Sequence, residues 1–153
     1  MEMTPIGHVR GGRAEVEDDE WGAVRARIEL DLDVGVVTGD AVLGLEAFSH
    51  VEVLFVFDRV DPASVCRGAR HPRDRADWPL VGILAQRAKD RPNRIGSTVC
   101  EVVAVGDGWL DVAGLDAVDG TPVLDVKPYL LGFAPRSAVR EPAWATELMD
   151  GYW

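Results

Sequence analysis

The chain is poor in cysteine and aromatic residues, and several common functional signatures are missing from it. Two of its 153 residues are cysteines, Cys66 and Cys100, and their spacing fits no metal site. No apolar run of roughly eighteen residues occurs, and no basic segment followed by an apolar one opens the chain. We therefore expect no membrane span and a cytoplasmic protein. The absence of a glycine-rich phosphate loop argues against a doubly wound nucleotide-binding fold.

The two cysteines leave one question open. Cys66 lies in a polar stretch and Cys100 in an apolar one. A reduced, buried thiol at Cys100 fits this pattern, and so does a single disulfide.

Length and charge limit the fold and its partners. With 153 residues and 47% hydrophobic content, the chain has enough material for one core, so we expect a single domain of residues 1–153. The net charge of −10 argues against indiscriminate binding of nucleic acid or anionic membrane. Residues 67–94 nevertheless hold seven arginines and one lysine against three aspartates. This basic strip fits recognition of an anionic partner, or simply a solvated arginine-rich loop.

Short apolar stretches with turn signals between them predict a mainly β fold. Residues 24–30 alternate apolar and charged side chains, residues 51–57 are the most hydrophobic run, and residues 80–85 read as a further strand. A hairpin is expected where residues 98–105 and 109–112 flank the Gly-Asp-Gly turn at 106–108. A short helix is expected after Pro142, and residues 58–79 read as a long loop. The pattern predicts a small antiparallel β-barrel or sandwich with a few short helices.

Two polar segments stiffened by proline and glycine stand out as a candidate site. In residues 87–96, Pro92 fixes its own backbone, and Gly96 is expected to allow a turn that other residues cannot adopt. In residues 119–129, Asp119-Gly120 reads as a tight turn before an extended run. Such segments suit a small-molecule site, and they are equally consistent with two ordinary surface turns.

Six motifs in the same order along the chain resemble those of the TsaA/TrmO-like family. They are PIG at 5–7, LEAFSH at 45–50, HPR at 71–73, GILAQR at 82–87, RPNRIG at 91–96 and DGTPVLDVKPY at 119–129. The resemblance implies a compact β-barrel that binds S-adenosylmethionine, as a homodimer with the site close to the subunit interface. It also implies methylation of N6 of threonylcarbamoyladenosine next to the anticodon, with the tRNA anticodon arm as partner.

The resemblance also assigns site residues. The cofactor contacts that it implies are Trp21, Gly22, Ala23, Asp58, Arg59, Arg87, Arg91, Asn93, Ala117, Val118, Asp119, Gly120 and Thr121. The acceptor contacts that we expect beside them are His71, Arg73 and Arg94. No metal is expected. An aspartate such as Asp119 would face the amine of the cofactor, and a guanidinium such as Arg91 would face its carboxylate.

Three residues of the last motif are candidates for catalysis. Asp125, Lys127 and Tyr129 alternate, so they share one face of an extended chain. The nitrogen of a ureido-like acceptor is weakly nucleophilic, and Asp125 would assist by removing its proton or orienting it. A structural ion pair that helps to close the barrel explains the same pattern.

Two departures from the family keep other functions open. Larger bacterial members carry an additional C-terminal domain, which we do not expect here, and most of this chain is acidic. The alternatives are a methyltransferase that acts on a small metabolite and a non-catalytic protein that senses S-adenosylmethionine.

Overall fold

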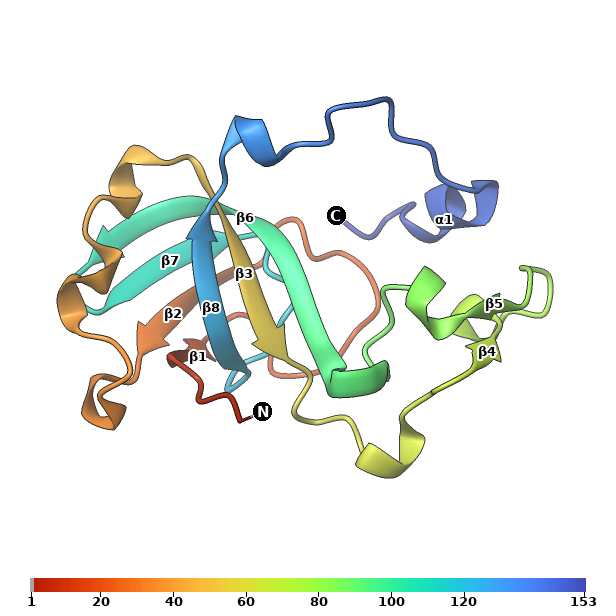
Figure 1. The fold of residues 1–153 in the computed structure, drawn as a ribbon, viewed down its shortest axis with the longest axis horizontal. Coiled ribbons are helices and arrows are strands. Elements are labelled where there is room, and N and C mark those ends of the chain that lie inside the picture. Colours follow the sequence, from red (N-terminus) through yellow and green to blue (C-terminus); the bar gives the residue numbers. More distant parts are fainter. Residues whose placement is uncertain (1) are drawn as a thin grey trace.

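A closed barrel of six antiparallel strands forms the body of the protein in the computed structural model, which describes residues 2–153 (Figure 1). The barrel strands are β1 (Gly7–Arg10), β2 (Arg25–Leu30), β3 (His50–Val56), β6 (Ile95–Gly106), β7 (Trp109–Ala113) and β8 (Pro122–Pro128). Their order is β1-β2-β7-β6-β3-β8, and β8 pairs back onto β1 to close the barrel. The predicted small antiparallel β-barrel is confirmed.

The barrel core follows from alternation along the strands. In β2 every second residue is buried, and in β3 the side chains of Val51, Val53 and Phe55 point inward. Ile28 and Leu110 fill the centre from the neighbouring strands β2 and β7 and are fully buried. Because inward-facing residues recur with the strand period, the interior is apolar and excludes water. The outer face is mixed, and Val99 and Val103 of β6 are each 45% exposed.

The remaining elements are short. A two-stranded sheet pairs β4 (Ala69–Arg70) with β5 (Val81–Gly82), and one α-helix, α1 (Ala143–Leu148), follows Pro142. The 3-10 turns are Leu32–Val34, Gly39–Val42, Leu45–Ala47, Pro62–Ser64, Pro72–Asp74, Ile83–Ala85, Pro92–Arg94 and Leu131–Phe133. We call residues 57–94, which lie beside the barrel at the right of Figure 1, the side lobe. Residues 11–24 are the N-terminal loop, and residues 141–153 are the C-terminal segment.

Most of the predicted elements are confirmed, including the hairpin of β6 and β7 and the helix after Pro142. Gly120 adopts a φ of +85°, as the expected Asp119-Gly120 turn requires. The strand predicted over residues 80–85 is wrong: only Val81 and Gly82 pair, and the chain then forms a 3-10 turn. These residues lie in the side lobe, where Leu84 is 78% exposed, so no barrel neighbour extends the strand.

Gly96 has a different role from the predicted turn. It lies inside β6, opposite Phe55 of β3, and a side chain there would place its Cβ 2.4 Å from the Phe55 ring. The left-handed turn falls earlier, on Asn93 and Arg94, whose φ angles are 64° and 53°. Glycine is needed at 96 because a large aromatic ring packs directly against the backbone.

Both cysteines are free, and Cys100 is buried in the barrel core. Burial raises the pKa of the Cys100 thiol to about 12, so it stays protonated. None of the helices within residues 2–153 is long and apolar enough to cross a membrane. Over the same residues, no group of three or more His, Cys, Asp or Glu side chains is placed to hold a metal ion.

The contact between Gly96 and Phe55 predicts the effect of one substitution. Gly96→Ala should lower the free energy of unfolding by about 2 kcal/mol, because the new methyl group overlaps the Phe55 ring, which is packed in the core and cannot move aside freely. Gly82→Ala is the matched control, since nothing lies within 4 Å of its added methyl group. Urea unfolding measures both. Equal stability of the two variants would contradict the packing role.

Candidate functional site

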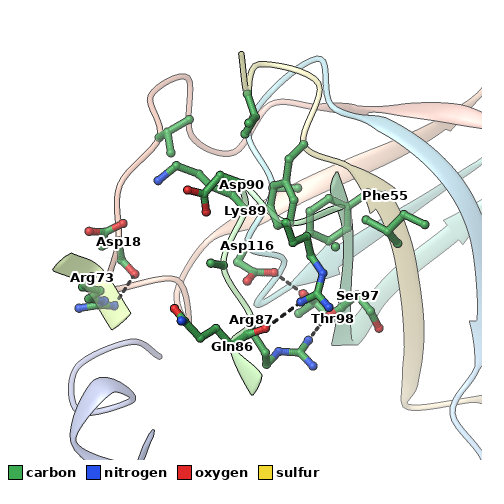
Figure 2. A pocket seen from close by; sticks show the side chains of 18 of the residues that line it. Asp18, Phe55, Arg73, Gln86, Arg87, Lys89, Asp90, Ser97, Thr98 and Asp116 are labelled. Atoms are coloured by element: carbon green, nitrogen blue, oxygen red, sulfur yellow. Dashed lines mark hydrogen bonds between the residues drawn. The ribbon is translucent and has the colours of Figure 1, made fainter. Parts of the chain in front are cut away.

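A large cleft of about 1320 Å³ lies where four parts of the chain meet (Figure 2). The mouth of the barrel, the N-terminal loop, the side lobe and the C-terminal segment each contribute lining residues. In Figure 1 the helix α1 of the C-terminal segment lies above β4 and β5 of the side lobe, and the end of the chain runs back toward the barrel. Segments remote in sequence therefore build one concavity.

The barrel supplies an apolar wall with one carboxylate in it. Phe55 of β3 makes an edge-to-face pair with Phe57, the first residue of the side lobe, with ring centroids 5.2 Å apart, and the buried Ala117 and Val118 also line the cleft. The residue before these two, Asp116, is half-buried and also faces the cleft (Figure 2). A charged group beside apolar surface is suited to orienting a polar ligand.

Two hydroxyl groups hold the Asp116 carboxylate. The Thr98 hydroxyl of β6 donates to one of its oxygens (Figure 2), and the Tyr152 hydroxyl of the C-terminal segment donates to the other, 2.5 Å away. Burial raises the pKa of Tyr152, and the negative charge of Asp116 raises it further. The phenol therefore remains protonated and acts as a donor.

The side lobe is held together at the cleft by an ion pair. Arg70 donates two hydrogen bonds to Asp90, at 2.6 and 2.7 Å, and both side chains are mostly buried. Gln86 is buried beside them and donates to the backbone oxygens of Arg70 and Val81. A bidentate, partly desolvated pair fixes geometry better than an exposed one. The ion pair and Gln86 thus tie several parts of the side-lobe wall together.

Residues 15–20 of the N-terminal loop are mostly acidic, and they are also bound by arginines. Arg73 of the side lobe donates to both oxygens of Asp19, at 2.7 and 3.1 Å, and this hydrogen-bonded pair raises the pKa of Arg73. Arg13 binds the backbone oxygens of Asp19 and Glu20. The pair of Arg73 and Asp19 joins the N-terminal loop to the side lobe, and the Arg13 contacts hold the loop itself in shape.

Strained backbone gathers around the cleft. Over residues 2–153, the non-glycine residues with positive φ are Glu20, Arg73, Asp74, Asn93 and Arg94. Three of them line the cleft, and the other two are next to lining residues. Such conformations cost free energy and concentrate at functional sites. The strained backbone therefore indicates a functional site independently of the size of the cleft.

Most of the expected cofactor residues line this cleft. The lining members are Trp21, Asp58, Arg59, Arg87, Arg91, Asn93, Ala117, Val118 and Thr121, and the expected acceptor residue Arg73 lines it as well. Arg91 donates to the Gln86 backbone oxygen at 2.8 Å, and Arg87 donates to the backbone oxygen of Ser97. Each guanidinium keeps further donors.

Other expected cofactor residues hold the walls in place instead of lining the cleft. Asp119 accepts a hydrogen bond from the Gly11 backbone at 2.8 Å, and its own backbone oxygen accepts one from Arg59 at 2.7 Å. Gly120 forms the turn beside it. Gly22 and Ala23 are exposed and lie outside the lining.

The expected acceptor residues His71 and Arg94 are likewise engaged in backbone contacts. His71 shares a hydrogen bond of 2.6 Å with the Trp78 backbone oxygen, and Arg94 donates to the Val60 backbone oxygen at 3.0 Å. Both residues are half-buried and outside the lining.

The expected catalytic residues lie elsewhere. Asp125 and Lys127 form an ion pair on the outer face of β8, and the Tyr129 backbone donates to His50 of β3. None of the three is among the residues that line the cleft. Their catalytic role stays a prediction, and the ion pair agrees with the structural alternative.

Sequence reasoning missed Asp116 and Tyr152. Asp116 directly precedes the expected cofactor turn at Ala117, so a search for carboxylates next to that turn would have found it. No sequence signal marks Tyr152, which lies 36 positions from Asp116. Only the folded path of the C-terminal segment brings the two together.

Comparison with known proteins finds a family model that matches most of the chain. Residues 18–134 match the family model of the tRNA-methyltransferase O N-terminal domain. A Pseudomonas aeruginosa protein described as a putative S-adenosylmethionine-dependent methyltransferase, RcsF, is 38% identical over 84% of this chain and 54% of its own length. The tRNA (adenine(37)-N6)-methyltransferase of Escherichia coli is 43% identical over 67% of this chain and 45% of its own length.

Two further matches extend this similarity. A probable S-adenosyl-L-methionine-binding protein from Methanothermobacter thermautotrophicus is 43% identical over 84% of this chain and 90% of its own length. The crystal structure of TrmO from Pseudomonas aeruginosa superposes with a TM-score of 0.69 and 31% identity, over 92% of this chain and 60% of that one. The chain thus spans about half of the length of its two bacterial relatives.

The contacts of Asp119 predict that it stabilises the fold. Asp119→Ala should lower the free energy of unfolding by about 1 to 2 kcal/mol, because the Gly11 amide loses a charged acceptor. Asp119→Asn keeps an acceptor oxygen and should lose less. Thermal or urea unfolding of the two variants checks this order, and full stability of Asp119→Ala would show that the contact contributes nothing.

Proposed function

Since this chain belongs to the family of tRNA-methyltransferase O N-terminal domains, we propose that it is an S-adenosylmethionine-dependent methyltransferase whose cofactor binds in the cleft. Its acceptor is N6 of the threonylcarbamoyl-modified adenosine next to the tRNA anticodon. The observation that carries the proposal is the coincidence of the family match with three walls of a strained, mixed polar and apolar cleft. The names of the Escherichia coli and Pseudomonas aeruginosa relatives support both cofactor and reaction.

The chemistry of the lining residues fits this cofactor. S-adenosylmethionine presents a flat base, a sulfonium and a zwitterionic amino-acid end, so it needs apolar surface, an anion and a cation close together. Phe55 and Phe57 offer the apolar surface, Asp116 is the anion, and Arg87 and Arg91 are the cations. Small-molecule pockets usually hold about 300–1,000 Å³. A cleft of about 1320 Å³ leaves room for an acceptor base beside the cofactor.

We assign each polar group a role on this basis. Asp116 faces the ammonium of the cofactor, and Arg87 and Arg91 face its carboxylate with the donors that their backbone contacts leave free. In this assignment Asp116 replaces Asp119, whose carboxylate is bound to Gly11. The cofactor supplies an electrophilic methyl group, so the protein has to align the reactants and exclude water from them.

The acceptor would enter along the side lobe. Arg73 and Lys89 both line the cleft, and their positive charges suit an anionic RNA backbone. His71 and Arg94 support the lobe from behind through their backbone contacts. For Asp125 to act as the base, with Lys127 and Tyr129 beside it, the acceptor has to reach the outer face of β8.

One observation favours a second candidate, methylation of a small metabolite. Within the described residues, Arg70, Arg73 and Arg75 of the basic strip are already paired with Asp90, Asp19 and Asp77. Ion pairs reduce the positive potential that would attract an RNA backbone. A small acceptor needs no such potential.

The proposed function is tested by cofactor binding and by nucleoside analysis. Calorimetry should detect S-adenosylmethionine binding, and Asp116→Asn should weaken it about tenfold, because the ammonium loses a charged partner. Asp33→Asn, an exposed aspartate in the 3-10 turn Leu32–Val34, is the matched control. Absence of binding by the unaltered protein would refute the proposed function.

Mass spectrometry of tRNA nucleosides after incubation identifies the acceptor. Appearance of the N6-methylated threonylcarbamoyladenosine supports the tRNA reaction. Binding without nucleoside methylation, but with a methylated metabolite in cell extract, favours the second candidate. Binding with neither product leaves a sensor of S-adenosylmethionine. Unchanged turnover of Asp125→Asn would remove that residue from catalysis.

We also propose a homodimer, in the cytoplasm where tRNA is modified. Large apolar side chains after β8 support an interface: Leu131 is 88% exposed and Phe133 is 85% exposed. Two large apolar side chains exposed two positions apart offer apolar surface that a partner can cover. A second copy of the chain is the occupant that we propose.

Sedimentation of the protein checks the dimer. The unaltered protein should sediment as a dimer, and the double variant Leu131→Asp, Phe133→Asp should sediment as a folded monomer, because two charges cannot be buried there without partners. Val139→Asp, at another exposed apolar position, should leave the dimer intact. A monomeric unaltered protein would contradict the proposal.

A further inference from the structure

The C-terminal segment is a built wall of the cleft. Its side chains Trp144, Leu148, Met149, Tyr152 and Trp153 line the concavity opposite the barrel. It lies outside residues 18–134, which match the family model. The family match therefore does not account for this wall.

The segment is tied to the N-terminal loop through its backbone. The amides of Glu20 and Trp21 donate to the backbone oxygens of Gly151 and Tyr152, at 2.9 and 2.7 Å. Gly22 follows, and a Cβ added there would lie 2.7 Å from the Trp153 carbonyl carbon. Gly22, expected to bind the cofactor, thus allows the segment to approach the loop closely.

A second tie joins the segment to the side lobe. The Trp78 indole donates to the Glu147 carboxylate at 2.8 Å, and the rings of Trp78 and Trp144 lie 6.4 Å apart. The helix α1 is therefore anchored on a buried tryptophan. With both ties made, Tyr152 reaches the barrel at a defined point.

That point is the Asp116 carboxylate. Tyr152 donates to one oxygen at 2.5 Å while Thr98 donates to the other, so hydroxyls from the segment and from the barrel fix the plane of the carboxylate. Arg73 and Arg87 line the same cleft as Asp116. The cleft thus holds an oriented anion together with cations, as a zwitterionic ligand requires.

We propose that Tyr152 is a positioning residue that holds Asp116 in the orientation that accepts the ammonium of the bound cofactor. The inference rests on the proposed function, since it assumes S-adenosylmethionine in the cleft. Tyr152 itself need not touch the cofactor. It holds the Asp116 carboxylate in one orientation before the ligand binds, so binding costs no further loss of side-chain entropy at Asp116.

Removal of single hydroxyl groups tests this role. Tyr152→Phe keeps the ring and deletes only the donor to Asp116. Thr146→Val is the matched control, because it also deletes a hydroxyl that donates to a carboxylate in the same segment, that of Glu141 at 2.6 Å. Thermal melting should show that both variants are folded.

Two ligands separate positioning from general damage to the cleft. Calorimetry should show that Tyr152→Phe lowers the affinity for S-adenosylmethionine roughly fivefold to twentyfold. The affinity for 5′-methylthioadenosine, which lacks the amino-acid end, should change less than about twofold. Thr146→Val should leave both affinities unchanged.

The possible failures are distinguishable. If the unaltered protein binds S-adenosylmethionine and Tyr152→Phe binds it equally well or better, the positioning role is wrong. Equal weakening of both ligands also overturns it, because the effect would not reach the ammonium. Absence of binding by the unaltered protein refutes the proposed function, and this inference with it.

Discussion

Closure of the barrel between its first and last strands is the constraint on which the rest of the structure depends. Around this seam the Val9 amide donates to Thr121 at 2.9 Å, and the Gly120 amide donates back to Val9 at 2.8 Å. Asp119 adds a side-chain contact to Gly11. Because residues 115–118 lead directly into the seam, closure brings Asp116, Ala117 and Val118 to the barrel mouth, where they line the cleft.

The charges around the cleft are arranged before a ligand arrives. The acidic N-terminal loop and the arginine-rich side lobe, which have opposite charge in the sequence, are joined through Asp19 and Arg73. Asp90 and Arg70 lock the lobe internally. Asp116 differs from these acids, because hydroxyl groups hold it and no residue of 2–153 forms an ion pair with it. Its carboxylate is therefore available to a cationic ligand, which is why we place the ammonium of the cofactor there.

The sequence predicts the barrel well and the site only in part, for a physical reason. Alternation of apolar residues is a local property of each strand, and it is retained in β2, β3 and the hairpin of β6 and β7. Residues 80–85 form a short apolar run that also predicts a strand, but the only strand they pair with lies in the side lobe, which no local pattern reveals. The contact between Asp116 and Tyr152 depends on how the C-terminal segment crosses the cleft. Contacts of this kind come from tertiary structure and leave no trace in spacing.

Hydrogen exchange with and without S-adenosylmethionine tests the central claim, that the cleft walled by the C-terminal segment is the cofactor site. Ligand binding slows the exchange of amides whose opening it suppresses. The account predicts slower exchange of the amides of Glu20 and Trp21, which bind the C-terminal segment, and of those in residues 95–98 and 115–118. Slowing confined to residues 125–129 on the outer face of β8, or no slowing at all, would contradict it.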